Sequence, residues 1–160
     1  MKSAIVAAAL ACAMSAQAGL LYNITYTDGG ANVASGVIDV AGGLAISGTL
    51  NVTAGAASGS WLLLPGAGSD GSFSWDNAVN PASDPFLTSG GLLFGNGTSE
   101  VNLWGTGPGT YDFYGNIGGN WNPVSDRGVA TIAPVPEPAA FGAIAGLGLL
   151  GFARWRRTMA

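Results

Sequence analysis

Acidic and amide side chains gather between positions 70 and 84, where their oxygen atoms could bind a calcium ion. Calcium takes carboxylate and carbonyl oxygens as ligands. The carboxylates are Asp70, Asp76 and Asp84, with the amides of Asn77 and Asn80 among them. The spacing lacks the Asp-x-Asp-x-Asp loop with a closing glutamate, and Asp and Asn also occur in turns for backbone reasons alone. We therefore favour turn formation, keep calcium as the alternative, and predict no metal site.

Hydrolysis of a glycosidic bond is a second chemistry that carboxylates can perform, when two of them flank a sugar. Glu100 could act with Asp112 or with Asp76, but nothing in the spacing selects either pair. The chain has no histidine, and its single cysteine, Cys12, precedes the expected domain. The commonest general base, thiol nucleophiles and the usual zinc sites are thereby excluded. We expect a protein that is not an enzyme and has no cofactor.

The region between residues 19 and 135 is strongly acidic. Eight carboxylates are balanced only by Arg127, which gives this region a formal net charge of −7. Such a surface repels nucleic acid, so no nucleic-acid partner is expected. A neutral exopolysaccharide remains possible as a partner.

Aromatic side chains could either stack on sugar rings or fill a core. The candidates are Trp61, Trp75, Trp104, Trp121, Tyr111 and Tyr114. Trp121 follows Gly118-Gly119-Asn120, so we expect it to be exposed and assign it as the possible glycan contact. Alternation places Tyr111 and Phe113 on one face of a strand and Asp112 and Tyr114 on the other, without saying which face is buried.

The end of the chain combines three distinct segments. Prolines at 134, 136 and 138 remove backbone donors and favour extended geometry. Residues 139–153 carry no charge and predict a short transmembrane helix, and Arg154, Trp155, Arg156 and Arg157 would stop it at the cytoplasmic side of the membrane. At the other end, Lys2 and the apolar run 4–14 precede Ala16-Gln17-Ala18, which predicts a signal peptide over 1–18 that signal peptidase removes before Gly19.

Val135, Pro136, Glu137 and Pro138, followed by the apolar segment and the arginines, resemble the PEP-CTERM sorting tag of exported bacterial proteins. The resemblance implies that exosortase, a membrane transpeptidase, cuts near the tag and passes the protein to the cell surface. The alternative is a C-terminal anchor that is never cut. The tag is sometimes labelled an ice-binding domain, but Thr25, Thr27, Thr49 and Thr53 are too few for a threonine ladder.

Strands with short glycine-rich turns must position these side chains. Segments of alternating or β-branched and aromatic character occur at 20–27, 35–40, 44–53, 61–64, 72–75, 91–94, 101–104, 110–114 and 127–132. In 44–53, alternation places Leu44, Ile46, Leu50 and Val52 on one face. Residues 76–86 form a polar loop. We predict an all-β fold, an antiparallel β-sandwich of the jelly-roll kind, flanked by the signal peptide and the transmembrane helix.

Three regions follow: a signal peptide (1–18), an exported β-sandwich domain (19–133) and a sorting tag (134–160). The function expected is that of a non-catalytic envelope or extracellular-matrix protein, transiently anchored in the inner membrane with its C-terminus in the cytoplasm and then cut by exosortase. The alternative is a polysaccharide- or calcium-binding surface module held by an uncleaved anchor.

Overall fold

The computed structural model describes residues 19–70 and 72–136. The predicted signal peptide, the residues Glu137 and Pro138, the predicted transmembrane helix and the arginine-rich end lie outside the described residues. Within the described ranges the one helix is a three-residue 3-10 turn, Gly55–Ala57. That part of the chain therefore holds no helix with the length and apolar character needed to cross a membrane.

Ten strands account for most of the described chain. Their bounds are β1 (Leu20–Asp28), β2 (Ala31–Ala41), β3 (Leu44–Val52), β4 (Gly59–Leu63), β5 (Gly68–Ser69), β6 (Ser74–Trp75), β7 (Leu92–Gly95), β8 (Glu100–Gly107), β9 (Thr110–Ile117) and β10 (Asn120–Pro134). The predicted all-β character is confirmed. Strand β10 is much longer than the predicted segment 127–132 because it begins directly after the Gly118-Gly119 turn.

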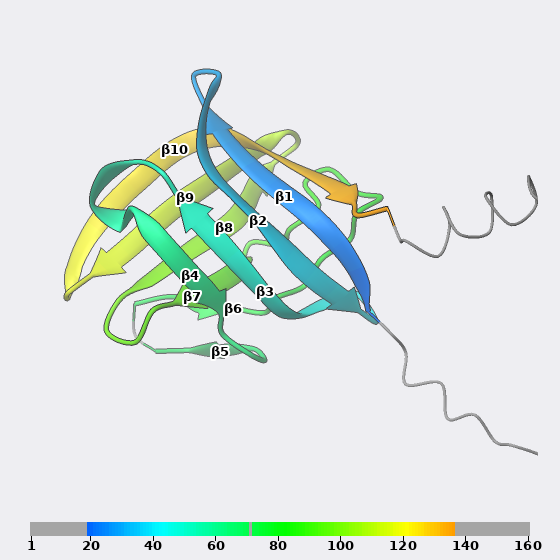
Figure 1. The fold of residues 1–160 in the computed structure, drawn as a ribbon, viewed down its shortest axis with the longest axis horizontal. Helices are drawn as coiled ribbons and strands as arrows, with labels where there is room; N and C mark the ends of the chain where they lie inside the picture. The colour runs from blue at the N-terminus through cyan, green and yellow to red at the C-terminus, as the bar shows by residue number, and fades with distance from the viewer. Residues whose placement is uncertain (1–18, 71, 137–160) are drawn as a thin grey trace, which may run out of the picture.

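Eight of these strands form a closed antiparallel barrel, in the order β1-β10-β9-β8-β7-β4-β3-β2 (Figure 1). The prediction of a β-sandwich was therefore wrong. The finding that overturns it is the pairing of the first strand with the last, from Tyr22 opposite Pro134 to Thr27 opposite Val129. This ladder joins the two edges that a sandwich would leave open, so all eight strands enclose one core.

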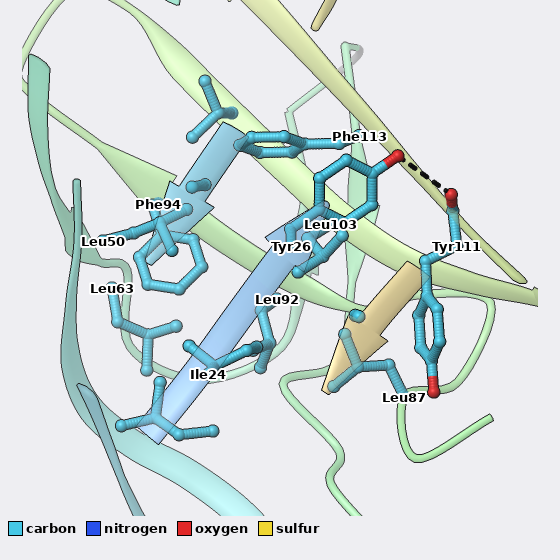
Figure 2. Packing of buried hydrophobic residues seen from close by; sticks show 14 of the residues in the cluster. Ile24, Tyr26, Leu50, Leu63, Leu87, Leu92, Phe94, Leu103, Tyr111 and Phe113 are labelled. Atoms are coloured by element: carbon cyan, nitrogen blue, oxygen red, sulfur yellow. Dashed lines mark hydrogen bonds between the residues drawn. The ribbon is translucent and has the colours of Figure 1, made fainter. Parts of the chain in front are cut away.

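Tyr26 lies at the centre of this core and links three strands. Its ring is fully buried and packs edge-on against Phe113, with 5.4 Å between ring centroids (Figure 2). Its hydroxyl accepts a hydrogen bond from the Gly128 N–H at 3.0 Å and lies 3.1 Å from the Tyr111 carbonyl and 3.0 Å from Ser125 Oγ. A Cβ at Gly128 would lie 2.3 Å from the tyrosine oxygen, so only glycine permits this close approach.

Strand β3 departs from the alternation that its sequence predicts. Leu50 and Val52 point into the core, but Leu44 and Ile46 are about half exposed, and the buried residue is Ala45. The cause is a β-bulge: Asp39 pairs with Ser47 and the next residue, Val40, pairs with Ala45. One extra residue shifts the phase of the strand and turns the two larger side chains outward.

The chain between β4 and β7 makes a long excursion that carries the small β5–β6 sheet. Asn77 holds this excursion in place: its amide nitrogen donates to the carbonyls of Leu64 and Gly66 at 2.7 and 2.8 Å, and its oxygen accepts from the Leu93 N–H at 3.3 Å. The predicted polar loop 76–86 also contributes Val79 and Phe86 to the core. The excursion is thus a fixed part of the molecule, and it forms one wall of the site described next.

Candidate binding groove on the outer face of the barrel

Strands β8 and β9 supply the floor of the groove. Tyr111 and Phe113 are buried in the barrel core, so Asp112 and Tyr114 point outward, which settles the orientation that alternation left open. On β8, Asn102 lies opposite Tyr114 and Trp104 lies opposite Asp112. These four outward side chains therefore form a compact square on neighbouring strands.

The excursion and the start of β10 supply the walls. Phe73 is buried against Trp121, with 4.9 Å between ring centroids, and Asn116 donates to Ser72 Oγ at 2.7 Å. Trp121 itself is 55% exposed. The groove has a volume of about 420 Å³ and is lined by Ser72, Phe73, Ser74, Ser89, Asn102, Trp104, Asp112, Tyr114 and Trp121. This size is within the range of small-molecule sites.

Asn102 has an unused, buried acceptor at the floor of the groove. Its amide nitrogen donates to the carbonyl of Gly90 at 3.2 Å and lies 3.5 Å from that of Ser74. Carbonyl oxygens only accept hydrogen bonds, so these two partners determine which end of the Asn102 side-chain amide is the nitrogen. The side-chain oxygen is buried and finds no hydrogen-bond partner among the described residues, and Asn102 is only 3% exposed.

Two carboxylates set the charge of the floor. Asp112 accepts a hydrogen bond from the Arg127 N–H at 3.0 Å. The Tyr114 hydroxyl is hydrogen-bonded to Asp126, which raises the pKa of Tyr114 to about 12, with further contributions from burial and from the charges of Asp126 and Asp112. Tyr114 is therefore a neutral donor at any ordinary pH.

A pair of carboxyl groups fastens the wall to the barrel. Asp70, at the turn before Ser72, shares a hydrogen bond with Glu100 of β8. This bond, together with burial and the charge of Asp70, raises the pKa of Glu100 to about 7, while the same bond lowers the pKa of Asp70. Asp70 also accepts from the N–H groups of Ser72 and Phe73 at 2.7 and 2.8 Å.

Aromatic rings border the groove on two sides. Trp104 and Tyr114 lie 5.5 Å apart between ring centroids with 33° between their planes. The Phe73–Trp121 pair faces the groove from the wall. An arrangement of aromatic faces around a few hydroxyl, amide and carboxylate oxygens can hold a flat molecule that has apolar faces and polar edges.

The other predicted aromatic candidates lie elsewhere. Trp61 is buried in the core and its indole N–H donates to the Ala57 carbonyl at 2.9 Å. Tyr111 is also a core residue and packs on Phe86. Trp75 lies over Gly68, and its buried indole nitrogen has no partner among the described residues.

The calcium candidates are separated in the structure. Asp76 accepts from the Thr88 hydroxyl and from the Ala78 N–H, and Asp84 accepts from the Gly109 N–H at 2.6 Å. Asp70 pairs with Glu100 instead. In the described ranges, no three acidic, histidine or cysteine side chains come together as a metal site. Asp70 and Asp76 accept from N–H groups in their own turns, and Asp84 accepts from the turn at Gly109.

Of the two carboxylate pairs considered for hydrolysis, Glu100 and Asp112 are well apart. Glu100 lies opposite Asn116 and Asp112 lies opposite Trp104, so the two positions are four residues apart along β8. At roughly 3.3 Å per residue this is about 13 Å. Glycosidases place their carboxyl groups about 5 to 9.5 Å apart.

Sequence reasoning missed Asn102, Phe73 and the Asp70–Glu100 pair. The alternation of 101–104 placed Asn102 and Trp104 on one face, and that was the available signal for Asn102. Nothing in the sequence showed that the excursion folds back over β8 and β9, because that contact joins positions far apart in the chain.

Comparison with known families gives a match at the end of the chain. Residues 134–157 match the family model of the PEP-CTERM protein-sorting motif. The chain therefore carries this motif, as its sequence indicated, and the motif supports exosortase-targeted sorting of an exported protein. Neither the curated proteins nor the solved structures gave a significant match.

Proposed function

We propose that this chain is a non-catalytic protein of the bacterial envelope or extracellular matrix, exported through its signal peptide and released by exosortase cleavage at its C-terminal tag. The observation that carries the proposal is the PEP-CTERM motif at 134–157. Exosortase and signal peptidase are its processing partners.

The start of the motif, as far as the structure describes it, is consistent with this proposal. Strand β10 ends at Pro134, and the Val135 N–H donates to the Leu21 carbonyl at 2.8 Å. Among the described residues this is the last backbone hydrogen bond that ties the chain to the barrel. The matched motif therefore starts at the last residue of β10 and continues directly from the barrel.

The hydrogen bonds that the carboxylates make support the proposal that the protein is not an enzyme. Asp70, Asp76 and Asp84 hold turns, and Glu100 holds Asp70. The chain has no histidine that could act as a base with any of them. These groups thus serve the architecture of the excursion, in keeping with a structural or binding role.

The test is the variant Glu137→Ala, expressed in a cell that has the exosortase. It removes the acidic residue of the motif and leaves its three prolines in place. The protein should remain uncut and stay with the cells, whereas the parent protein appears in shortened form at the surface or in the medium. A matched control is Asp28→Ala, which removes an exposed carboxylate from the barrel and should be processed normally. Normal processing of Glu137→Ala would refute recognition of the motif.

A further inference from the structure

We propose that the groove binds a neutral polysaccharide, with one sugar ring held between the Phe73–Trp121 and Trp104–Tyr114 pairs and its hydroxyls bonded to Asn102 and Asp112. This goes beyond the sorting function because it assigns a ligand class to the barrel itself. It does not depend on cleavage of the tag, since all its residues lie between positions 72 and 121.

Trp121 offers a preformed stacking surface. Trp121 is 55% exposed, yet its ring lies 4.9 Å from that of Phe73 between centroids. Phe73 is only 5% exposed, and its N–H donates to Asp70. The ring is therefore oriented before any ligand arrives, and little side-chain entropy is lost on binding. The C–H faces of a sugar ring are suitable partners for such an aromatic face.

The unpaired oxygen of Asn102 calls for a hydroxyl donor. A buried acceptor without a partner costs roughly 1–3 kcal/mol relative to a satisfied one. Asn102 lines the groove, and its nitrogen is already bonded to the wall, so the amide cannot turn to find another partner. This oxygen is covered in the structure, so a sugar hydroxyl would supply the missing donor once the side chains over it move aside.

The charge of the groove selects a neutral polymer. Asp112 lies on the floor, Asp126 adjoins Tyr114, and none of the described lining residues is basic. The carboxylate of a uronic acid would meet these charges without a cation to balance it. A neutral sugar, by contrast, can donate its hydroxyls to Asp112, whose interaction with the Arg127 N–H occupies only one oxygen in the structure.

The experiment uses the exported protein as it is isolated from its producing cells. Its tryptophan fluorescence and its retention in gels are measured with dextran and cello-oligosaccharides as neutral probes and polygalacturonate as the acidic probe. The neutral probes should change the fluorescence and retard the protein, and polygalacturonate should do neither. Trp121→Ala should weaken neutral binding about tenfold, from the loss of roughly 1.4 kcal/mol of stacking and apolar contact.

Leu62→Ala is the matched control, because Leu62 is 63% exposed on β4 and does not line the groove. It should bind as the parent protein does. No response to any neutral probe would overturn the proposal, as would equal weakening by Trp121→Ala and Leu62→Ala. A response to an apolar dye alone would show that the groove takes an apolar partner, and this also contradicts the proposal.

A second variant tests the charge argument by itself. Asp112→Asn keeps an oxygen that can accept from the Arg127 N–H and removes the negative charge from the floor. Binding of polygalacturonate should rise at low salt, while binding of dextran should change by less than about threefold. If Asp112→Asn leaves the preference between the two polymers unchanged, the groove does not select by charge and the assignment to neutral glycans fails.

Discussion

The carboxyl pair Asp70–Glu100 predicts an unusual dependence of stability on pH. The pKa of Glu100 in the folded protein is about 7, against an ordinary value of 4.5. The folded state therefore keeps a proton that the unfolded chain releases between these two values. This contribution to the free energy of unfolding is fully present below pH 4.5 and is lost as the pH rises through 7. The lowered pKa of Asp70 acts in the opposite sense: its contribution is lost as the pH falls below 3.8.

The size of the effect depends on the pKa shift of Glu100 and on how far solvent reaches the two carboxyl groups. A rise in the pKa of Glu100 from 4.5 to about 7 corresponds to about 3 kcal/mol of free energy of unfolding if the group is fully shielded from solvent. Glu100 is only partly buried and Asp70 is exposed, so solvent screens much of this interaction. We expect about 1 kcal/mol after that reduction.

The perturbation is Glu100→Gln, which places an amide donor opposite Asp70 at every pH. The free energy of unfolding is measured by urea denaturation at pH 5 and pH 8. From pH 5 to pH 8, the free energy of unfolding of the parent protein should fall by about 1 kcal/mol more than that of the variant. Asp28→Asn, an exposed change of the same charge, should behave as the parent does. If Glu100→Gln and the parent lose stability equally, the two carboxyl groups do not share a proton and the reasoning is refuted.

Two other substitutions test the core and the excursion. Tyr26→Phe leaves the buried Gly128 N–H without its acceptor. In urea denaturation it should lower the free energy of unfolding by about 1–3 kcal/mol. A loss below about 0.5 kcal/mol would contradict the role of the Tyr26 hydroxyl in the core. Asn77→Gly keeps the left-handed backbone (φ 52°) but removes three hydrogen bonds. It should lower the free energy of unfolding by about 2 kcal/mol and speed amide hydrogen exchange at Leu93. Unchanged exchange at Leu93 would contradict the anchoring role of Asn77.

The sequence allowed the strands to be predicted but not the way in which they close. Alternation and turn glycines are local signals, and they located nine of the ten strands, although the short strand Gly68–Ser69 and the first half of β10 were missed. Whether such strands form two sheets or one barrel depends on the pairing of β1 with β10, which joins residues about a hundred positions apart. No local pattern reports that pairing, so sandwich and barrel look alike in the sequence.

The errors within the strands have similar causes. Leu44 and Ile46 were placed on the same face as Leu50 and Val52 because the alternation of 44–53 is regular, and a bulge that depends on the partner strand turned them the other way. For the groove, the outward position of Trp121 followed from its turn glycines, whereas its support by Phe73 required the fold of the excursion. The unpaired Asn102 oxygen is visible only when the surrounding carbonyls are in place.

The central claim is that this protein is exported and cut at its C-terminal motif, and the intact mass of the protein recovered from the cell surface or the medium tests it most directly. The account predicts a product that begins at Gly19 and lacks Arg154, Trp155, Arg156 and Arg157. A mature surface form that retains these four residues would contradict the claim.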